Sequence, residues 1–305
     1  MKRRLLIPGA WVLTAVCLCS QPDFVIRSDV RLVLLDVDVK DRHGNSVSGL
    51  EKSNFRVIEN GKDQPITIFA HEDLPVTVGI LVDESSSMRP KRAQVLAAAE
   101  TFVEASNPRD EVFVLNFNDT VTRGLPSGVP FSGDLGQLRS ALARGIPRGR
   151  TSLHDAIIDG LEQLESGRRD KKALVVISDG GDTASRHTRA EMLKRVERSA
   201  ATIYSIGVYD ADDPDRDPRM LREIARISGG DAFFPETPEQ TVPICRRIAQ
   251  DIRSRYTIGY IPPASGSPDS PRQARVRVSS PQRGKLTART RSTYRYDQLE
   301  TSSKK

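Results

Sequence analysis

The sequence contains little cysteine: Cys17, Cys19 and Cys245 are its only three among 305 residues. Two of them fall in the first twenty residues, MKRRLLIPGAWVLTAVCLCS, where a basic start, a short apolar stretch and small residues match a secretory signal peptide. We expect residues 1–20 to be removed on export, giving a periplasmic or extracellular protein, or a membrane-tethered one if uncleaved. A mature chain that holds only Cys245 cannot form an intramolecular disulfide, so its stability must come from core packing and from any bound metal.

Long apolar runs and histidines are also scarce. No segment after residue 20 has the length and hydrophobicity that a membrane span requires, so we predict none in the mature chain. The four histidines (His43, His71, His154 and His187) do not pair with a cysteine in a zinc-binding pattern. The Gly-x-Ser-x-Gly pattern of hydrolase nucleophiles is absent around residues 85–87. These absences argue against a zinc site and a serine hydrolase.

Charge is divided unevenly along the chain. Residues 242–305 hold 14 Lys or Arg against 4 Asp or Glu, and residues 21–241 carry a net charge of -7. A basic C-terminal part can indicate nucleic acid or an anionic surface as a partner. Its arginines alternate with Val, Thr and Ser in QARVRVSS and KLTARTRSTYRY, which is typical of the solvent face of β-strands. We favour that interpretation and predict no nucleic-acid partner.

Residues 74–255 alternate between strand and helix patterns. Continuous Val, Ile and Leu runs such as VTVGILV, EVFVLNF, KALVVIS and TIYSIGV stand between amphipathic segments such as SLHDAIIDGLEQLES. Strands that are apolar on both faces belong to a mostly parallel sheet covered by helices on both sides. The predicted fold class is therefore α/β, a doubly wound sheet of Rossmann-like type.

Smaller β-rich segments flank this body. Residues 24–73 form a predicted β-rich leader with a hairpin at Asn60-Gly61, and residues 256–296 form predicted strands around a Pro/Ser-rich loop. Residues 297–305 are polar and expected to be disordered. Two arrangements are open for the leader and the C-terminal strands: they pair with each other and frame the body, or they present an edge to another subunit.

Oxygen-bearing residues follow three points of the predicted sheet edge. Asp83, Ser85 and Ser87 come directly after a buried strand, Thr151 opens a helix, and Asp179 ends another buried strand before two glycines. Ligands of open α/β sheets bind at the carboxyl ends of the strands. Each segment alone could be an ordinary helix cap or turn. All three in this order, each beside a predicted sheet edge, are a much more specific sign of a ligand-binding site.

Three segments resemble those of the metal-ion-dependent adhesion site of von Willebrand factor type A (VWA) domains: DESSSM, GRTSLHDAI and VISDGGD. Two flanking segments are similar to parts of secreted bacterial VWFA-related proteins of the acidobacterial type. They are LVLLDVDVKDRHGNSVSGLEKSNFRVIENGKDQPI before the body and RYTIGYIPP after it. The resemblance implies that Asp83, Ser85, Ser87, Thr151 and Asp179 bind a metal ion, which accepts an Asp or Glu of a partner protein.

Elementary coordination chemistry agrees with this resemblance. Mg²⁺ prefers oxygen ligands, usually keeps waters, and takes only one or two carboxylates from the protein. Hydroxyl groups are neutral ligands, so two aspartates leave the cation incompletely neutralised and attractive to a further carboxylate. We expect Mg²⁺, with Mn²⁺ or Ca²⁺ as possible substitutes, in a protein-binding module for adhesion or assembly.

Nearby polar residues receive other interpretations. Asp155 is expected to hydrogen-bond a loop backbone, and Glu84 to make the rim of the site more acidic. Asp182 either contacts groups that support the metal ligands or is a solvated loop residue, and we favour the solvated residue. The loop YDADDPDRD at 209–217 lacks the glycine and terminal glutamate of an EF-hand, so we predict no calcium site there.

Two alternatives stay open. The first is a Mg²⁺-dependent hydrolase or phosphoryl-transfer enzyme, for which Arg148 and Arg150 are the only obvious cationic clamp. The second is a metal-free structural scaffold, in which the serines merely cap a helix. We predict that the protein is not an enzyme.

Overall fold

The computed structural model describes residues 32–209, 213–263 and 271–294. The predicted signal peptide at 1–20, the first residues of the leader and the predicted tail at 297–305 lie outside the described residues. Described residues 32 onward belong to one compact unit that begins at Arg31. Among the helices of these ranges, none combines the length and apolar character that crossing a bilayer requires.

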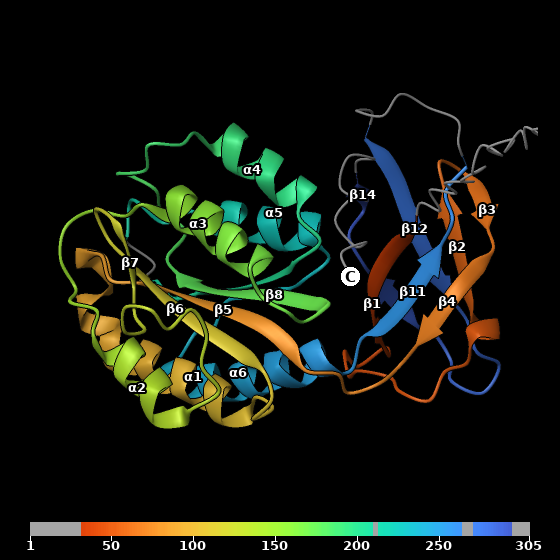
Figure 1. Cartoon of the computed structure of the whole chain (residues 1–305), viewed down its shortest axis with the longest axis horizontal. Coiled ribbons are helices and arrows are strands. Elements are labelled where there is room, and N and C mark those ends of the chain that lie inside the picture. The colour runs from red at the N-terminus through yellow and green to blue at the C-terminus, as the bar shows by residue number, and fades with distance from the viewer. Residues whose placement is uncertain (1–31, 210–212, 264–270, 295–305) are drawn as a thin grey trace, which may run out of the picture. The chain divides into compact units, whose positions relative to one another are not determined.

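The body is a six-stranded sheet in the order β10-β9-β8-β5-β6-β7, with helices on both faces (Figure 1). Five strands run parallel and β7 joins the edge antiparallel. Helices α1, α2 and α6 lie on one face, and α3, α4 and α5 lie on the other. The elements are β5 Val76–Asp83, α1 Arg92–Ala105, β6 Glu111–Phe117, β7 Val121–Arg123, α2 Leu135–Ala143, α3 Leu153–Glu165, β8 Lys171–Ser178, α4 Arg189–Arg198, β9 Thr202–Gly207, α5 Pro218–Ser228, β10 Ala232–Phe233 and α6 Pro238–Arg253. The predicted fold class is confirmed.

The apolar runs explain the layered core. All eight residues of β5 are buried, as are all six of β9, because helices cover both sides of these strands. Gly79 lets the Phe113 side chain of β6 pack closely against β5, since a Cβ added there would lie 2.3 Å from Phe113 Cζ. The body core is thus built from the patterns that the sequence displays.

Two elements differ from the sequence expectation. Helix α2 was not predicted, although Asp134 caps it by accepting a hydrogen bond from Gln137 N at 2.7 Å. A 3₁₀ helix, η2 Ser86–Lys91, stands between β5 and α1, where the sequence pattern indicated no helix before residue 91. Pro90 within this segment has no N–H to donate, which suits a short 3₁₀ turn ahead of α1.

The β-rich flanks form two four-stranded sheets, in the orders β13-β1-β11-β4 and β14-β12-β2-β3. Each sheet combines strands from before and after the body, as one of the sequence hypotheses expects. The elements are β1 Val33–Lys40, η1 Lys52–Asn54, β2 Phe55–Glu59, β3 Lys62–Gln64, β4 Ile66–Ala70, β11 Tyr256–Tyr260, β12 Arg272–Val278, β13 Thr287–Arg289 and β14 Thr293–Tyr294. Asn60 and Gly61 join β2 to β3 with φ of 47° and 82°, the positive values that a two-residue hairpin turn requires.

The flank has its own apolar core, which includes the fully buried rings of Tyr256, Tyr260 and Tyr294. Buried charges join it to the body. Lys40 Nζ lies 2.5 Å from Asp251 Oδ1 of α6. Arg255 donates to Tyr204 Oη at 3.0 Å and to the Gly229 carbonyl at 2.8 Å. These pairs fix the flank against α5, α6 and β9.

Candidate metal centre

Four of the five candidate ligands lie at the carboxyl ends of the two central strands, β5 and β8. After β5 the chain adds β6 on one side, and after α3 it adds β8 on the other side. The chain therefore reverses direction across the sheet between β5 and β8, and such a switch point forms the binding crevice of open α/β sheets. Asp83 ends β5, and Asp179 directly follows β8.

Asp83 is a buried carboxylate with two hydrogen-bond donors. Its side chain accepts from Ser178 Oγ at 2.6 Å and from Ser85 N at 2.9 Å. Burial, reinforced by the negative charge of Asp179, raises the pKa of Asp83 to about 7. Within the described residues, neither carboxylate forms an ion pair with a Lys, Arg or His side chain. Two acidic groups thus share a buried site that supplies no protein cation.

Hydroxyl groups connect the two carboxylates. Ser85 Oγ and Ser87 Oγ lie 3.0 Å apart, and Ser87 Oγ donates to Asp179 Oδ2 at 2.6 Å. Ser85 occupies the N-cap position of η2, yet its side chain makes no capping hydrogen bond. Helix capping therefore does not account for Ser85, and four of the five predicted residues form one continuous set of oxygen atoms.

Thr151 is brought to this set by the backbone. It is buried and lies one residue before Ser152, which is the N-cap of α3, so it precedes the helix instead of capping it. Its carbonyl accepts hydrogen bonds from Thr183 N and Ala184 N, both at 2.9 Å. The preceding loop is joined to the serine segment by a bond from Ser86 N to the Gly149 carbonyl at 3.1 Å. Thr151 thus lies between the loops that carry the other four residues.

The two glycines after Asp179 are required by close packing. Gly180 has a φ of 90°, and a Cβ there would lie 2.4 Å from the carbonyl oxygen of Asp217. Asp217 N donates to the Asp179 carbonyl at 3.2 Å. Asp217 also caps α5 through Met220 N at 2.9 Å. The end of the acidic loop therefore has a structural role beside the site, while residues 210–212 of that loop lie outside the described residues.

Polar contacts beside the candidate ligands fix the loop at 182–188 against α3. Asp155 accepts from Arg186 N and His187 N, both at 3.1 Å, as the sequence predicted. Burial opposes the ionisation of Asp155, but these hydrogen bonds outweigh it and lower its pKa. Asp182 accepts from His154 N at 3.1 Å and from Ser185 Oγ at 2.5 Å. The interpretation of Asp182 as a merely solvated residue was wrong.

Glu84 also differs from its expectation. It is 2% exposed, and its carboxylate pairs with Arg92 Nε at 3.2 Å, so it does not make the rim acidic. Burial raises the pKa of Glu84, which the nearby Arg92 opposes. A Cβ on Gly145 would collide with this side chain, so the contact also holds the loop after α2 in place.

The donor set fits a hard divalent cation. All five candidate side chains offer oxygen, two of them carboxylate and three hydroxyl, which is the ligand type that Mg²⁺ prefers. No group of three or more His, Cys, Asp or Glu side chains that could hold a metal is found in the part of the chain that the structure describes. A donor set made only of carboxylate and hydroxyl oxygens does not suit a structural zinc ion, which is bound mainly by Cys sulfur and His nitrogen.

The arrangement gives little support to catalysis. His154 Nδ1 faces the His187 carbonyl at 3.1 Å and Asp182 at 3.3 Å, and no hydrogen bond among the described residues joins it to Ser85 or Ser87. Arg150, one of the two arginines that a phosphoryl-transfer site would use as a cationic clamp, pairs instead with Asp119, Nε to Oδ1 at 3.3 Å. A nucleophile-and-base pair, which covalent catalysis needs, is not assembled here.

The family model for the von Willebrand factor type A domain matches residues 77–244, more than half of the chain. The chain belongs to the von Willebrand factor type A domain family. VWA domains are often adhesion or protein-interaction modules and are mostly not enzymes.

Solved structures are similar to this chain at low sequence identity. A von Willebrand factor type A protein from Catenulispora acidiphila is 14% identical, with a TM-score of 0.51 over 88% of this chain and 74% of its own. The vWF domain of the type V pili tip protein Mfa5 from Porphyromonas gingivalis is 15% identical over 59% of this chain and 95% of its own, with a TM-score of 0.48. BatB from Bacteroides thetaiotaomicron is 18% identical over 59% of this chain and 100% of its own, with a TM-score of 0.45. No curated protein sequence matches the chain significantly.

Proposed function

We propose that this protein is an exported, metal-dependent protein-binding module of the kind used in adhesion or assembly. Asp83, Ser85, Ser87, Thr151 and Asp179 would hold one divalent cation, Mg²⁺ by preference, with Mn²⁺ or Ca²⁺ able to replace it. The observation that carries this proposal is the pair of buried aspartates at the switch point. Hydroxyl groups connect them, and no ion pair joins them to a Lys, Arg or His among the residues that the structure describes.

A cation at this site would replace hydroxyl hydrogens as the positive partner of both carboxylates. Ser178 and Ser87 donate to Asp83 and Asp179 at 2.6 Å each, so the carboxylates already face strong donors. Neutral hydroxyl ligands contribute no further negative charge, and a metal ion held in this way attracts a carboxylate from outside. The partner that fits is therefore a protein that presents an exposed Asp or Glu.

Export and the narrower family assignment complete the proposal. The basic and apolar start of the chain supports a signal peptide, and a soluble mature protein outside the cytoplasm follows from its removal. The flanking segments support membership of the secreted, acidobacterial-type VWFA-related proteins, in which the five residues form a complete metal-ion-dependent adhesion site.

The first test is thermal unfolding of residues 21–305 after treatment with EDTA and then with millimolar Mg²⁺, Mn²⁺ or Ca²⁺. A ligand that binds only the native state raises the unfolding midpoint by mass action. Asp83→Ala should abolish the rise. Asp170→Ala is the matched control, because Asp170 is an exposed aspartate just before the opposite end of β8, and it should retain the rise. An equal rise in Asp83→Ala would contradict the site.

The second test concerns the partner. An array of peptides that contain Asp or Glu, each paired with its Asn or Gln counterpart, would be probed with the protein in Mg²⁺ and in EDTA. We expect binding only to acidic members, only with Mg²⁺, and only by protein with an intact Asp83. Binding that ignores the carboxylate or survives EDTA would refute the proposed recognition.

A further inference from the structure

A groove of about 750 Å³ lies on the β14-β12-β2-β3 sheet, far in sequence from the candidate ligands of the metal centre. Four arginines line it. Arg56 extends from β2, Arg275 and Arg277 from β12, and Arg226 from α5. Asp63 is the only acidic residue among its lining residues. We call this feature the arginine groove.

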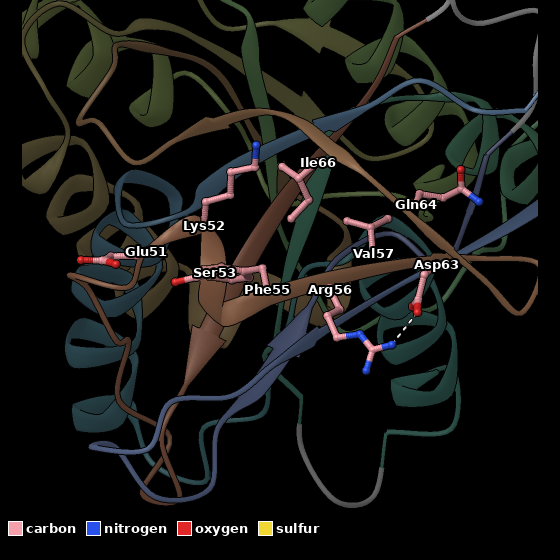
Figure 2. Close-up of a pocket in the computed structure, with 9 residues that line it drawn as sticks. All are labelled: Glu51, Lys52, Ser53, Phe55, Arg56, Val57, Asp63, Gln64 and Ile66. Carbon is pink, nitrogen blue, oxygen red and sulfur yellow. Dashed lines mark hydrogen bonds and ion pairs between the residues drawn. The ribbon is translucent and has the colours of Figure 1, made fainter.

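The charges of the arginine groove are not balanced by the protein. Arg56 pairs with Asp63 at 2.5 Å, and Figure 2 shows the two side chains pointing toward each other. Within the described residues, the side chains of Arg226, Arg275 and Arg277 form no ion pair and no hydrogen bond. All three are exposed. Three guanidinium groups in one concave surface therefore lack an anion.

The register of the sheet adds to this imbalance. Arg56 stands directly opposite Arg277 in the pairing of β2 with β12. Like charges directly opposite each other destabilise a sheet, so folding alone does not favour this placement. The neighbouring hollow drawn in Figure 2, of about 630 Å³, shares Arg56 and Asp63 but offsets its cations with Glu51. An excess of positive charge therefore distinguishes the arginine groove from this neighbouring hollow.

The uncharged lining narrows the choice of ligand. Asn60, Gln273, Ser292 and Thr293 line the groove with amide and hydroxyl groups, which both donate and accept hydrogen bonds. None of the described residues that line it is aromatic, whereas single-stranded nucleic acids are bound by stacking on aromatic rings. The apolar anchors that protein interfaces and membrane insertion use are reduced to Ile58 and Ala274.

We propose that the arginine groove binds an acidic polysaccharide. The planar fork of arginine matches carboxylate, sulfate and phosphate groups with two parallel hydrogen bonds. The amide and hydroxyl groups of the lining suit the sugar hydroxyls that lie between those charges. This binding requires no divalent cation, so it is separate from the metal centre and would give the protein a second surface for extracellular material.

The test measures binding of residues 21–305 to polygalacturonate and dextran sulfate, with neutral dextran as the uncharged probe, in EDTA and at low salt. Arg275→Gln/Arg277→Gln is the test variant. Arg123→Gln/Arg144→Gln removes the same charge from two exposed arginines of the body that form no side-chain ion pair or hydrogen bond within the described residues. We expect wild type to bind both acidic polymers and not dextran. The test variant should bind at least about tenfold more weakly, because each charge-assisted hydrogen bond contributes substantially to affinity.

Three results would overturn the proposal. The first is no binding to either acidic polymer. The second is an equal loss in the control variant, which would indicate a general charge effect. The third is binding of a single-stranded DNA oligonucleotide, or of vesicles with anionic lipid, that is as tight as binding of the polysaccharides and is lost in the test variant. Asp83→Ala should bind the polymers like wild type, so failure of the metal centre leaves this proposal intact.

Discussion

Asp83→Asn should stabilise the metal-free protein and abolish its stabilisation by metal. Burial and the charge of Asp179 raise the pKa of Asp83 from the ordinary value of 3.8 to about 7. Asparagine removes the charge and keeps the shape. Its oxygen can still accept from Ser85 N, and its amide can donate to Ser178 Oγ, which then acts as an acceptor.

The direction of the effect follows from proton binding. Between about pH 4 and pH 7 the unfolded chain has released the Asp83 proton while the native protein still holds it. The native state therefore binds more protons, and the free energy of unfolding falls as pH rises through this interval. One pH unit corresponds to about 1.4 kcal/mol, so the charged carboxylate costs about 4 kcal/mol above pH 7. After about 1 kcal/mol for imperfect hydrogen bonding, a gain of about 2–4 kcal/mol remains for the variant.

The assay compares thermal midpoints of wild type and Asp83→Asn in EDTA at pH 5 and pH 8. Each kcal/mol corresponds to about 2–4 °C for a chain of this size. The variant should unfold at a higher temperature at pH 8, with little difference at pH 5. With Mg²⁺ at about 100 times its dissociation constant, wild type should gain about 2.7 kcal/mol and the variant nothing. A variant that is less stable than wild type in EDTA at pH 8 would refute the reasoning.

Three further predictions concern the scaffold. Lys40→Met should lower the free energy of unfolding by about 3–5 kcal/mol, because it leaves the buried Asp251 with only the more distant Arg247 Nε at 3.9 Å. Urea denaturation measures this, and a loss below about 1 kcal/mol would contradict the role of the pair. Gly79→Ala should destabilise by about 1–3 kcal/mol, since the new methyl group meets the Phe113 ring, and an unchanged melting curve would be the opposite result. Burial raises the pKa of Cys245 to about 12, so a thiol reagent should label it only as fast as the protein unfolds; rapid labelling of the native protein would disprove this.

Much of the body could be predicted because its signals are local. Buried strands such as β5 and β8 appear as continuous apolar runs, and α3 appears as a helical stripe. Helix α2 was missed because it is short and contains Gly136, a poor helix former, although Asp134 and the spacing of Leu138 and Leu142 mark it in hindsight. The pairing of the leader with the C-terminal strands was foreseen only as a possibility, because contacts between residues some two hundred positions apart leave no register in the sequence.

The candidate site likewise contains residues whose place could be predicted from the sequence and residues whose role could not. Asp83 and Asp179 were placed correctly at the sheet edge because strand ends are visible in the sequence, and two glycines mark the turn after Asp179. The roles of Asp182 and Glu84 were predicted wrongly, because each depends on a partner from another segment. Asp182 contacts His154, and Glu84 pairs with Arg92. A local pattern shows that a residue is polar but not which distant group it contacts.

The most direct test of the account is a titration of residues 21–305 with Mn²⁺, followed by the electron paramagnetic resonance signal of the free ion. The five-residue site predicts that wild type removes one equivalent of Mn²⁺, that Mg²⁺ displaces it, and that Asp83→Asn and Thr151→Val bind far more weakly. Unchanged binding in both variants, or no binding by wild type at millimolar Mn²⁺, would contradict the assignment of these residues as metal ligands.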